Sequence, residues 1–592
     1  MNASDFVLGV TASLSGRRWL WRTGEERVAS GIVQRLGVPE IVGRLLAARA
    51  VDIDQAGLFL EPTLRAMLPD PSALVDMDLA ADRLAEAVRR GETVAVFGDY
   101  DVDGACGAAL MVGLLRMLGC AVHHHVPDRI VEGYGPNVPA LRRLVGLGAS
   151  LIVCVDCGTA AAETLASVAG QADVIVLDHH KAEGPPPVVL ATVNPNRLDD
   201  HSGLGTLCAA GVAFLAAVAT VRALRRLGHF NGAAEPDLLS LLDLVALATV
   251  CDVMPLTGLN RALVCQGLKV MARRARPGIA ALLEVTGARE RLNASTCGFA
   301  LGPRINAGGR ISEADLGLRL LLTEDRIEAL ALAERLESVN RQRQDVESII
   351  MDTAMRSAEA QVARGHAVLL VAGEGWHPGV VGIVAGRIKE RFNRPACVTA
   401  ISDGVGKGSG RSVPGLDLGA AIIAARQAGL LSTGGGHAMA AGFSLHSERM
   451  DAFHAFLDER LAAARVLPGA ADLAIEGSLT VQGATTEVAQ QLERLAPFGA
   501  GNEEPMLVLH RARVLRADRV GREGNTVRAF VEGEGGGPRL KVMLFRAREG
   551  ALADALLARG QGMAMHLAGH LRAEAWNGSV TPCFVVSDAA IA

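Results

Sequence analysis

The chain has 592 residues, half of them apolar, and a formal net charge of −5. One hydrophobic core does not organise a chain of this length, so three or four domains are expected, and the apolar content excludes an intrinsically disordered protein. The negative balance excludes nucleic-acid binding through a global basic field, so any such binding must come from local arginine clusters.

Compartment signals point to the cytoplasm. Ten cysteines stand at irregular spacings, which fits a reducing cytosol better than a disulfide framework. Residues 1–10 have no basic stretch before their short apolar run, so no secretory signal is expected. Residues 202–221 carry no charge and are long enough to span a bilayer, but they are mostly small and lie between two halves of the candidate site. We predict a buried helix there, and no membrane contact.

Apolar segments alternate with helix-length stretches from residue 93 to about residue 254. Residues 93–97, 150–155 and 174–177 predict buried strands, and their separation by helices favours a parallel sheet of the βαβ kind. Acidic and histidine residues follow directly after these strands. The carboxyl ends of parallel strands are where open α/β sheets place their ligands.

The first candidate site residues follow the strand at residues 93–97. The segment reads VAVFGDYDVDG and places Asp99, Asp101 and Asp103 at alternate positions in a turn. Capping of the helix that follows needs one aspartate. Three like charges this close together are costly unless cations neutralise them. A metal site is therefore favoured over a simple capped turn.

Three later apolar segments also end in candidate ligands. These are Asp156, the triplet Asp178-His179-His180, and Asp252. Carboxylates and a histidine at such positions suit two hard divalent cations, Mn²⁺ or Mg²⁺. A pair of these ions lowers the pKa of a bridging water and stabilises the attacking and leaving oxygens of a phosphate ester. The residues by themselves thus indicate phosphate-ester hydrolysis.

Two other patterns of metal-binding residue types are interpreted more simply. Cys154 and Cys157 have C-x-x-C spacing, but no second thiol pair accompanies them, so we predict two small core residues. The run of histidines at residues 123–125 favours a polar strand end over a metal site.

The second half of the chain predicts a helix and two further domains. Apolar residues at three-, four- and seven-residue spacings predict a long connecting helix over residues 325–360. A second, smaller α/β domain rich in glycine turns follows. Beyond residue 468, alternating strands at residues 474–479, 506–515, 526–531, 540–544 and 563–571 predict a small β-barrel of OB type, with a small sandwich as the alternative.

The order of these motifs resembles that of the DHH phosphoesterase superfamily. The motif DYDVDG, then Asp156, Asp178-His179-His180 and Asp252 carry the resemblance, with GPRINAGGR (302–310), WHPGVVGI (376–383), GSGRS (408–412), GGGH (434–437) and PFGAGN (497–502). From about residue 70 to the end, the chain is similar to the bacterial single-strand-specific 5′→3′ DNA exonucleases of that superfamily.

This resemblance implies the domains. A segment at residues 1–75 is expected to pack on a catalytic DHH domain at residues 76–324. The connecting helix then leads to a DHH-associated domain at residues 361–465 and an OB-like domain at residues 466–592.

The resemblance also implies residue roles. The metals would be held by Asp101, Asp103, Asp156, His179 and Asp252, with Asp99 in or near the shell, while Asp178 orients the histidines. His180 and Arg304 would contact the scissile phosphate. The implied substrate-binding residues are His180, Arg304, Asn306, Arg310, His377, Arg411, Ser412, Gly435, Gly436 and His437.

The implied activity is 5′→3′ hydrolysis of single-stranded DNA to 5′-mononucleotides in DNA repair and recombination. Two Mn²⁺ or Mg²⁺ ions would serve a monomer, with a helicase and a single-strand-binding protein as partners. The alternatives are a DHH phosphodiesterase for oligoribonucleotides or cyclic dinucleotides, and a non-catalytic replication scaffold. An OB-like domain favours a polymeric substrate, and the intact set of ligands argues against a scaffold.

Overall fold

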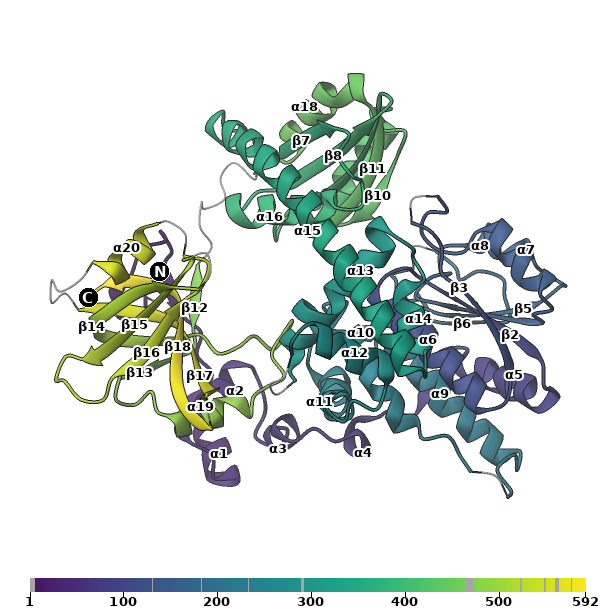
Figure 1. The fold of residues 1–592 in the computed structure, drawn as a ribbon, viewed down its shortest axis with the longest axis horizontal. Coiled ribbons are helices and arrows are strands. Elements are labelled where there is room, and N and C mark those ends of the chain that lie inside the picture. Colours follow the sequence, from purple (N-terminus) through teal and green to yellow (C-terminus); the bar gives the residue numbers. More distant parts are fainter. Residues whose placement is uncertain are drawn as a thin grey trace.

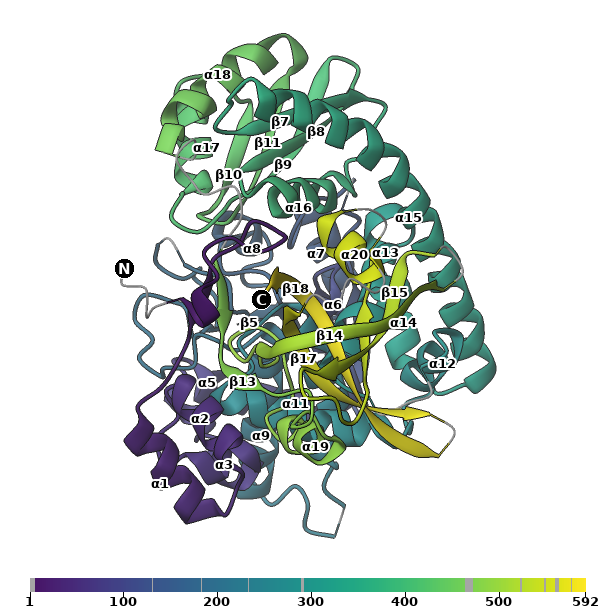
Figure 2. The same cartoon turned by 90° about the vertical axis from the view of Figure 1, so that its left-hand side faces the viewer.

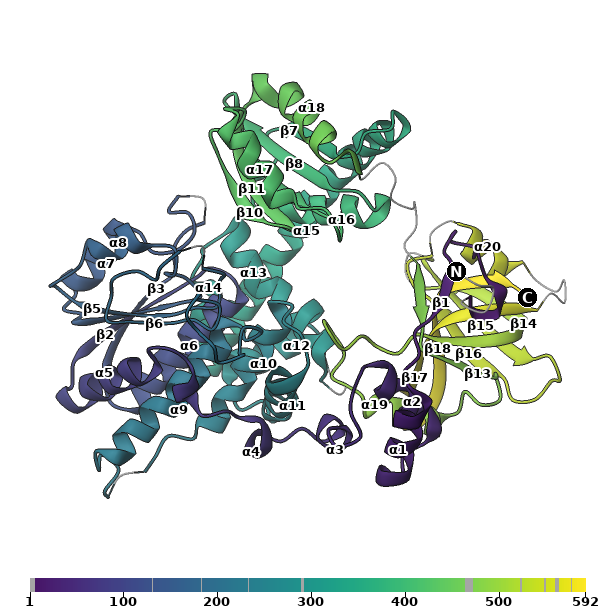
Figure 3. The same cartoon turned by 180° about the vertical axis from the view of Figure 1, so that it is seen from behind.

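The computed structural model describes residues 6–129, 131–182, 184–232, 234–288, 292–463, 472–521, 524–547, 550–558, 564–576 and 578–592. Figures 1 and 3 show three groups of elements: a lobe at residues 64–322 that is expected to be catalytic and is called the catalytic lobe, a second α/β domain at residues 367–463 and a C-terminal β-domain at residues 472–592. One helix, α15 (Arg326–Ala363), lies where the sequence predicts a connecting helix. It runs from the second domain down alongside α13 and α14 of the catalytic lobe (Figure 2).

The catalytic lobe is built on a five-stranded sheet of order β3-β2-β4-β5-β6, in which all neighbours are parallel. The strands are β2 (Thr93–Gly98), β3 (Ala121–His125), β4 (Leu151–Val155), β5 (Asp173–Leu177) and β6 (Ala191–Val193). Residues at alternate positions face opposite sides, and both sides are buried, which explains the continuous apolar runs. The predicted parallel sheet is confirmed.

Helices cover both faces of this sheet. One face packs against α5 (Met77–Arg90), α6 (Val102–Met117) and α9 (Ala209–Arg226). The other packs against α7 (Val138–Gly146) and α8 (Ala162–Ala166), and this core includes Cys154 and Cys157. Both cysteines are free thiols, so the prediction of two core residues is confirmed.

The uncharged segment at residues 202–221 contributes most of the buried helix α9. None of the helices in the described part of the chain combines the length and apolar character needed to cross a membrane. Beyond α9, the lobe continues through α10 (Leu242–Cys251), α11 (Gly258–Ala272), α12 (Pro277–Val285), α13 (Gly302–Ile311) and α14 (Leu316–Leu322).

The second domain has a mixed sheet of order β10-β11-β9-β8-β7, in which only β7 and β8 pair in parallel. Its strands are β7 (Leu369–Glu374), β8 (Ala396–Ser402), β9 (Val405–Arg411), β10 (Thr433–His437) and β11 (Ala440–His446); its helices are α16 (Val381–Phe392), α17 (Leu418–Gln427) and α18 (Met450–Arg460). The GGGH motif forms the edge strand β10, not a flexible turn, because its residues pair with β11.

The β-domain contains β13 (Gly477–Leu479), β14 (Leu507–Val520), β15 (Thr526–Gly533), β16 (Leu540–Leu544), β17 (Met565–Trp576) and β18 (Ser579–Ile591). Strand β14 pairs with both β15 and β17, and the pairings β15–β16, β16–β18 and β18–β17 complete a ring. The predicted mixed α/β class with a C-terminal OB-like domain is confirmed. Strand β18 was not predicted, because Pro582 and the adjacent polar residues Ser587 and Asp588 interrupt its alternation.

The prediction that residues 1–75 pack on the catalytic lobe is wrong for the first part of that segment. Strand β1 (Trp19–Trp21) pairs with β12 (Leu473–Ile475), and the apolar faces of α1 (Glu26–Leu36) and α2 (Glu40–Ala48) join the core of the β-domain. Contact with the catalytic lobe begins near Phe59, whose carbonyl accepts a hydrogen bond from Arg261. Pairing between residues 19 and 473 leaves no local sequence signal.

A buried hydrogen bond joins the N-terminal segment to the β-domain. The indole Nε1 of Trp19 donates to Asp588 Oδ2 at 2.9 Å, and Trp19 has no exposed surface. We predict that Trp19→Phe lowers the free energy of unfolding of the β-domain by about 1–3 kcal/mol, because a buried carboxylate loses its donor. Trp21→Phe, at a position 38% exposed, is the matched control. Equal denaturation midpoints for the two variants would contradict this assignment.

Candidate metal centre and substrate groove

The sheet topology brings the predicted ligands to one edge. Asp99 follows β2, Asp156 follows β4 and Asp178 follows β5, and these three strands are neighbours in the sheet. Because the strands are parallel, their carboxyl ends meet at one edge. Asp252 arrives from the other half of the lobe, at the carboxyl end of α10. Asp156 has a left-handed backbone (φ +63°), which turns the chain sharply at the site.

Two of the aspartates in DYDVDG also cap helices. Asp101 Oδ1 accepts from the backbone N–H groups of Asp103 and Gly104 at the start of α6. Asp103 accepts from the N–H groups of Ala209 and Ala210, at 2.6 and 2.8 Å, at the start of α9. Capping therefore positions these carboxylates, and the two functions that the sequence presents as alternatives coexist.

His179 lies at the centre of the carboxylates. Its Nε2 is 3.3 Å from Asp156 Oδ1, 3.5 Å from Asp252 Oδ2 and 3.7 Å from Asp103 Oδ2. A single hydrogen on Nε2 cannot satisfy three carboxylates at once. A cation shared among these groups can.

The ligands form two adjacent sets. In one, Asp99, Asp101 and Asp156 place ligand atoms within 4.8 Å of one another; in the other, Asp103, His179 and Asp252 do so. Asp156 also approaches His179, so it lies between the sets. Buried oxygens of Asp99, Asp156 and Asp252 have no hydrogen-bond partner. Unpaired buried carboxylate oxygens fit two neighbouring divalent cations and are costly without them.

Burial favours the protonated form of these carboxyls when no cation is present. Burial, reinforced by neighbouring carboxylates, raises the pKa of Asp99, Asp103 and Asp156 above the usual range. The same causes raise the pKa of Asp252 to about 8. Cation binding must therefore release protons from this cluster.

His180 is held by Asp178 and Tyr134. Burial alone would lower the pKa of His180, but the 2.8 Å hydrogen bond from its Nδ1 to Asp178 outweighs burial and raises the pKa to about 9. Burial alone would raise the pKa of Asp178, yet His180 and the Thr159 N–H bring it well below its usual range. The Tyr134 hydroxyl, 3.2 Å from His180 Nδ1, donates to the carbonyl of Asp156. Asp178 is thus placed to orient His180, and its predicted orienting role stays a prediction.

Arginines gather beside the carboxylates. Burial, together with repulsion from Arg129, Arg343 and Arg411, lowers the pKa of Arg310 to about 10, while Asp101 opposes this shift. Arg310 lies close to the metal loop because Gly309 packs on the carbonyl of Tyr100, where a Cβ would approach to 2.6 Å. Mutually repelling guanidinium groups next to a candidate cation site are chemically suited to binding phosphate groups.

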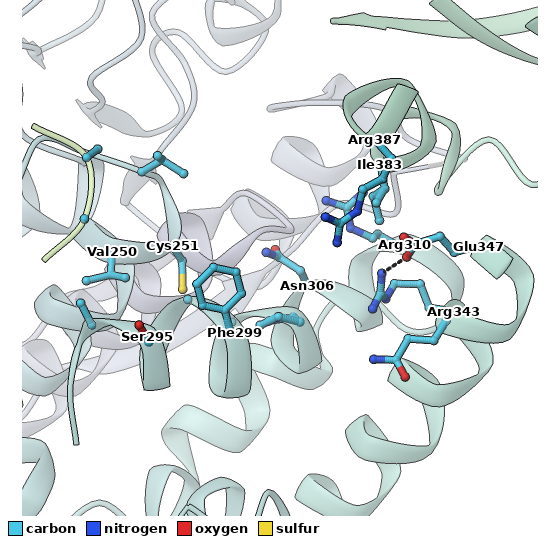
Figure 4. A pocket seen from close by; sticks show the side chains of 18 of the residues that line it. Val250, Cys251, Ser295, Phe299, Asn306, Arg310, Arg343, Glu347, Ile383 and Arg387 are labelled. Carbon is cyan, nitrogen blue, oxygen red and sulfur yellow. Dashed lines mark hydrogen bonds and ion pairs between the residues drawn. The ribbon is translucent and has the colours of Figure 1, made fainter. Parts of the chain in front are cut away.

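A groove of about 1120 Å³ extends from this arginine cluster, and catalytic-lobe, α15, second-domain and β-domain residues line it. Arg310, Arg343 and Arg387 lie near one end, and Phe299 projects into the other (Figure 4). The Phe299 side chain is 80% exposed, which is unusual for an aromatic residue without a partner to stack on.

The PFGAGN motif fastens the β-domain to this groove. Its residues Phe498, Gly499 and Ala500 line the wall, and the Ala500 carbonyl accepts from the Leu256 N–H at 2.7 Å. The fully buried Asn502 donates to the carbonyls of Leu495 and Pro497 and so holds the loop closed.

Two predicted substrate residues are occupied elsewhere. Arg304 pairs with Glu337 of α15 at 2.6 Å and donates to the Ala300 carbonyl, so it joins α13 to α15. Ser412 is fully buried and donates to the Leu416 carbonyl. The burial of Ser412 contradicts its assignment to substrate binding, whereas the role of Arg304 stays a prediction. A motif identifies a segment, but the direction of each side chain depends on packing.

The other predicted substrate-binding residues of α13 and the second domain lie in the groove wall or elsewhere in the second domain. Asn306 and Arg310 belong to the groove wall, and Arg310 donates to the Gly379 carbonyl beside His377. Arg411 contacts Ser409 Oγ at 2.9 Å. Gly435, Gly436 and His437 lie on β10, at the sheet edge toward the catalytic lobe (Figures 1 and 3).

Sequence reasoning missed Arg129, Tyr134 and Phe299. Arg129 and Tyr134 lie in the loop after β3, whose carboxyl end reaches the same sheet edge as the ligands. A prediction that residues 121–125 form a strand of this sheet would have placed the following loop at the same edge. The three histidines lie in β3, and they belong to none of the metal-binding groups found among the described residues.

Sequence models of three families match the chain. They are described as the DHH family N-terminal domain (residues 93–249), the DHHA1 domain (365–463) and the RecJ OB domain (475–588). The predicted resemblance to the DHH superfamily is confirmed.

Curated relatives and solved structures agree. The single-stranded-DNA-specific exonuclease RecJ of Dickeya dadantii is 39% identical over 531 residues, which cover 86% of this chain and 89% of the relative. That of Bacillus subtilis is 33% identical over 588 residues, covering 98% and 71%. The crystal structure of RecJ from Thermus thermophilus in complex with Mn²⁺ matches with a TM-score of 0.80 at 31% identity, covering 96% of this chain and 79% of that one.

We predict that Mn²⁺ binding releases protons near neutral pH. Below pH of about 4 the Asp252 carboxyl is protonated in both folded and unfolded states; between that pH and its folded pKa of about 8, only the folded, metal-free state keeps the proton. The free energy of unfolding of the metal-free protein should therefore fall as the pH rises from about 4 to about 8 and level off above that. Calorimetric titration with Mn²⁺ in buffers of different ionisation enthalpy should show proton release that declines above pH 8. Release that is unchanged in Asp252→Asn would contradict the assignment.

The two arginines of α13 are predicted to behave differently. Arg310→Ala should weaken binding of single-stranded DNA about 10- to 100-fold, because a charge-assisted phosphate contact is lost. Arg304→Ala should lower the melting temperature but leave binding by the folded protein within about threefold of wild type. Fluorescence anisotropy and thermal melts of both variants test this pair. Weaker DNA binding by Arg304→Ala alone would restore the original assignment.

Proposed function

The chain belongs to the RecJ family of single-stranded-DNA-specific exonucleases, and on this premise we propose that it hydrolyses single-stranded DNA from the 5′ end to 5′-mononucleotides, using two Mn²⁺ or Mg²⁺ ions. One observation carries the proposal. Two adjacent sets of ligands with unpaired buried oxygens lie beside a groove that contains arginines, and Cys251 and Val253, the chain neighbours of Asp252, line this groove. This arrangement has cation sites for the reacting phosphate and guanidinium groups for the phosphates that flank it.

The chain's own residues divide the work. When bound, the metal ions supply an ionised water at neutral pH and stabilise charge on the phosphate oxygens. Asp156 lies between the two ligand sets, and His179 fixes the position of Asp252 relative to Asp103. His180, kept protonated by Asp178, has a positively charged ring suited to contacting the scissile phosphate. Tyr134 keeps that ring turned toward the carboxylates.

Preference for single strands follows from the shape and lining of the groove. Phe299 offers an aromatic face on which an unpaired base can stack, whereas a base inside a duplex has no free face. Arg411, held by Ser409 and repelled by Arg129, faces the same charge cluster from the second domain. We assign it to the terminal phosphate or to the adjacent backbone. The β-domain holds the strand at the far end of the groove.

Partners and location are also proposed. Ten free cysteines support action in the reducing cytoplasm. An exonuclease that needs unpaired ends requires a source of them, so a helicase and a single-strand-binding protein are the expected partners. We propose a monomer, because one chain contributes every ligand and every wall of the groove.

The catalytic assignment predicts that Asp156→Ala abolishes cleavage but leaves single-strand binding within about threefold of wild type, because binding depends mainly on the arginines. Substrates labelled at the 5′ or 3′ end, duplex DNA, short RNA and a cyclic dinucleotide are compared, each with Mn²⁺ and with chelator. Asp173→Ala, remote from the ligands at the start of β5, is the control. Cleavage at wild-type rate by Asp156→Ala would exclude the site, and preference for RNA or the cyclic dinucleotide would exclude the substrate.

The groove assignment predicts that Phe299→Ala weakens binding of single-stranded DNA by about 5- to 100-fold, the loss of roughly 1–3 kcal/mol of base stacking. The metal ligands are untouched, so the rate at saturating DNA should change far less than the KM. Leu239→Ala, which removes another exposed apolar side chain, is the control. A KM equal to that of wild type would remove Phe299 from the DNA path.

A further inference from the structure

A second group of metal-binding side chains lies in the second domain. His366 lies in the turn between α15 and β7, while His454 and Asp458 lie on α18. The two α18 residues are four positions apart and therefore share one face of the helix. Ligand atoms of these three residues lie within 4.8 Å of one another. None of them belongs to the catalytic ligand sets described above.

The geometry favours a shared ion over a direct hydrogen bond. His366 Nδ1 is 3.3 Å from Asp458 Oδ2. His366 Nδ1 is nevertheless buried without a hydrogen-bond partner. The distance would allow a hydrogen bond, but the angle of approach does not. The rings of His366 and His454 stack at 4.7 Å with an angle of 25° between their planes. Side chains that are close together but not aimed at one another suit coordination of a common third atom.

The surrounding backbone prepares each ligand. His454 Nε2 is 2.8 Å from the Val368 carbonyl. A carbonyl oxygen only accepts, so Nε2 carries the hydrogen and the neutral ring keeps its lone pair on Nδ1. Metal-binding histidines characteristically donate their other N–H in this way. Asp458 Oδ1 accepts from the Val368 N–H at 3.1 Å and from the Ala367 N–H, which fixes the carboxylate.

The setting of the cluster is open and acidic. It lines a cavity of about 400 Å³ that also includes Asp451 and Glu459, and no lysine or arginine lines it in the part of the chain that the structure describes. Negative charge raises the local concentration of cations. Two imidazoles and one carboxylate match the ligand preference of zinc and similar transition metals, not that of Mg²⁺ or Ca²⁺.

We propose that His366, His454 and Asp458 bind one zinc-class transition-metal ion, separate from the catalytic ions. Three protein ligands leave one position of a tetrahedral ion for water. The ion would join the turn after α15 to α18 and thereby stiffen the attachment of the second domain to the connecting helix. Its effect on stability should follow simple ligand linkage, greater at higher free zinc.

The test measures bound zinc directly in the full-length protein. Wild type, His366→Ala, His454→Ala and the control His446→Ala are dialysed against micromolar ZnCl₂ with excess Mg²⁺ to occupy the catalytic carboxylates, and metal per chain is determined by elemental analysis. His446 is an exposed histidine at the end of β11 in the same domain. Wild type and His446→Ala should bind one zinc more than the other two variants. Zinc should raise the melting temperature only where that ion is bound.

Two results would overturn the proposal. One is equal zinc content in wild type and in both cluster variants; the other is no zinc above one-tenth of an ion per chain in any protein. Zinc-free melts show whether each variant is folded. If His366→Ala or His454→Ala melts early, Co²⁺ replaces Zn²⁺ in the wild-type protein. The visible absorption bands of tetrahedral Co²⁺ then support the site, and their absence rejects it.

Discussion

The concentration of buried negative charge at one edge of the parallel sheet is the constraint on which the rest of this structure depends. Asp99, Asp103 and Asp156 are each no more than 3% exposed, and some of their oxygens have no partner. In a protein interior such charges are unfavourable unless protons or cations neutralise them. Backbone N–H groups at the N-termini of α6 and α9 stabilise part of this negative charge. The carboxylate oxygens that have no hydrogen-bond partner are available to metal ions.

The same constraint explains why arginines surround the centre at a distance. Among the described contacts, neither Arg310 nor Arg129 forms an ion pair with the carboxylates. The two arginines repel one another. Their charge is therefore available to phosphates that enter the groove. Arg304, in contrast, is paired with Glu337 and contributes to the packing of α13 on α15. Of these two arginines of α13, Arg304 is therefore neutralised by an ion pair, whereas Arg310 lies in the groove wall without a described ion pair.

The groove exists only where separate domains meet. Arg261 shows how they are joined: from α11 it donates to the carbonyls of Phe59 and Ala496, connecting the N-terminal segment and the β-domain to the catalytic lobe. Burial lowers the pKa of Arg261 to about 10, but the two carbonyl oxygens and the ring of Phe59 stabilise its positive charge. The Arg310 contact with Gly379 joins the second domain in turn.

Local patterns predicted the parallel sheet, the candidate ligands at its carboxyl edge and the connecting helix, because strand alternation, helix periodicity and the cost of clustered carboxylates depend on neighbouring residues. The family followed from the order of its motifs. The tertiary contacts place residues 6–56 with the β-domain, pair Arg304 with Glu337, bring Tyr134 beside His180 and place Phe299 in the wall of the groove. Each of these depends on contacts between residues far apart in the chain, and the burial of a side chain against a distant partner leaves no periodic trace in the sequence around it.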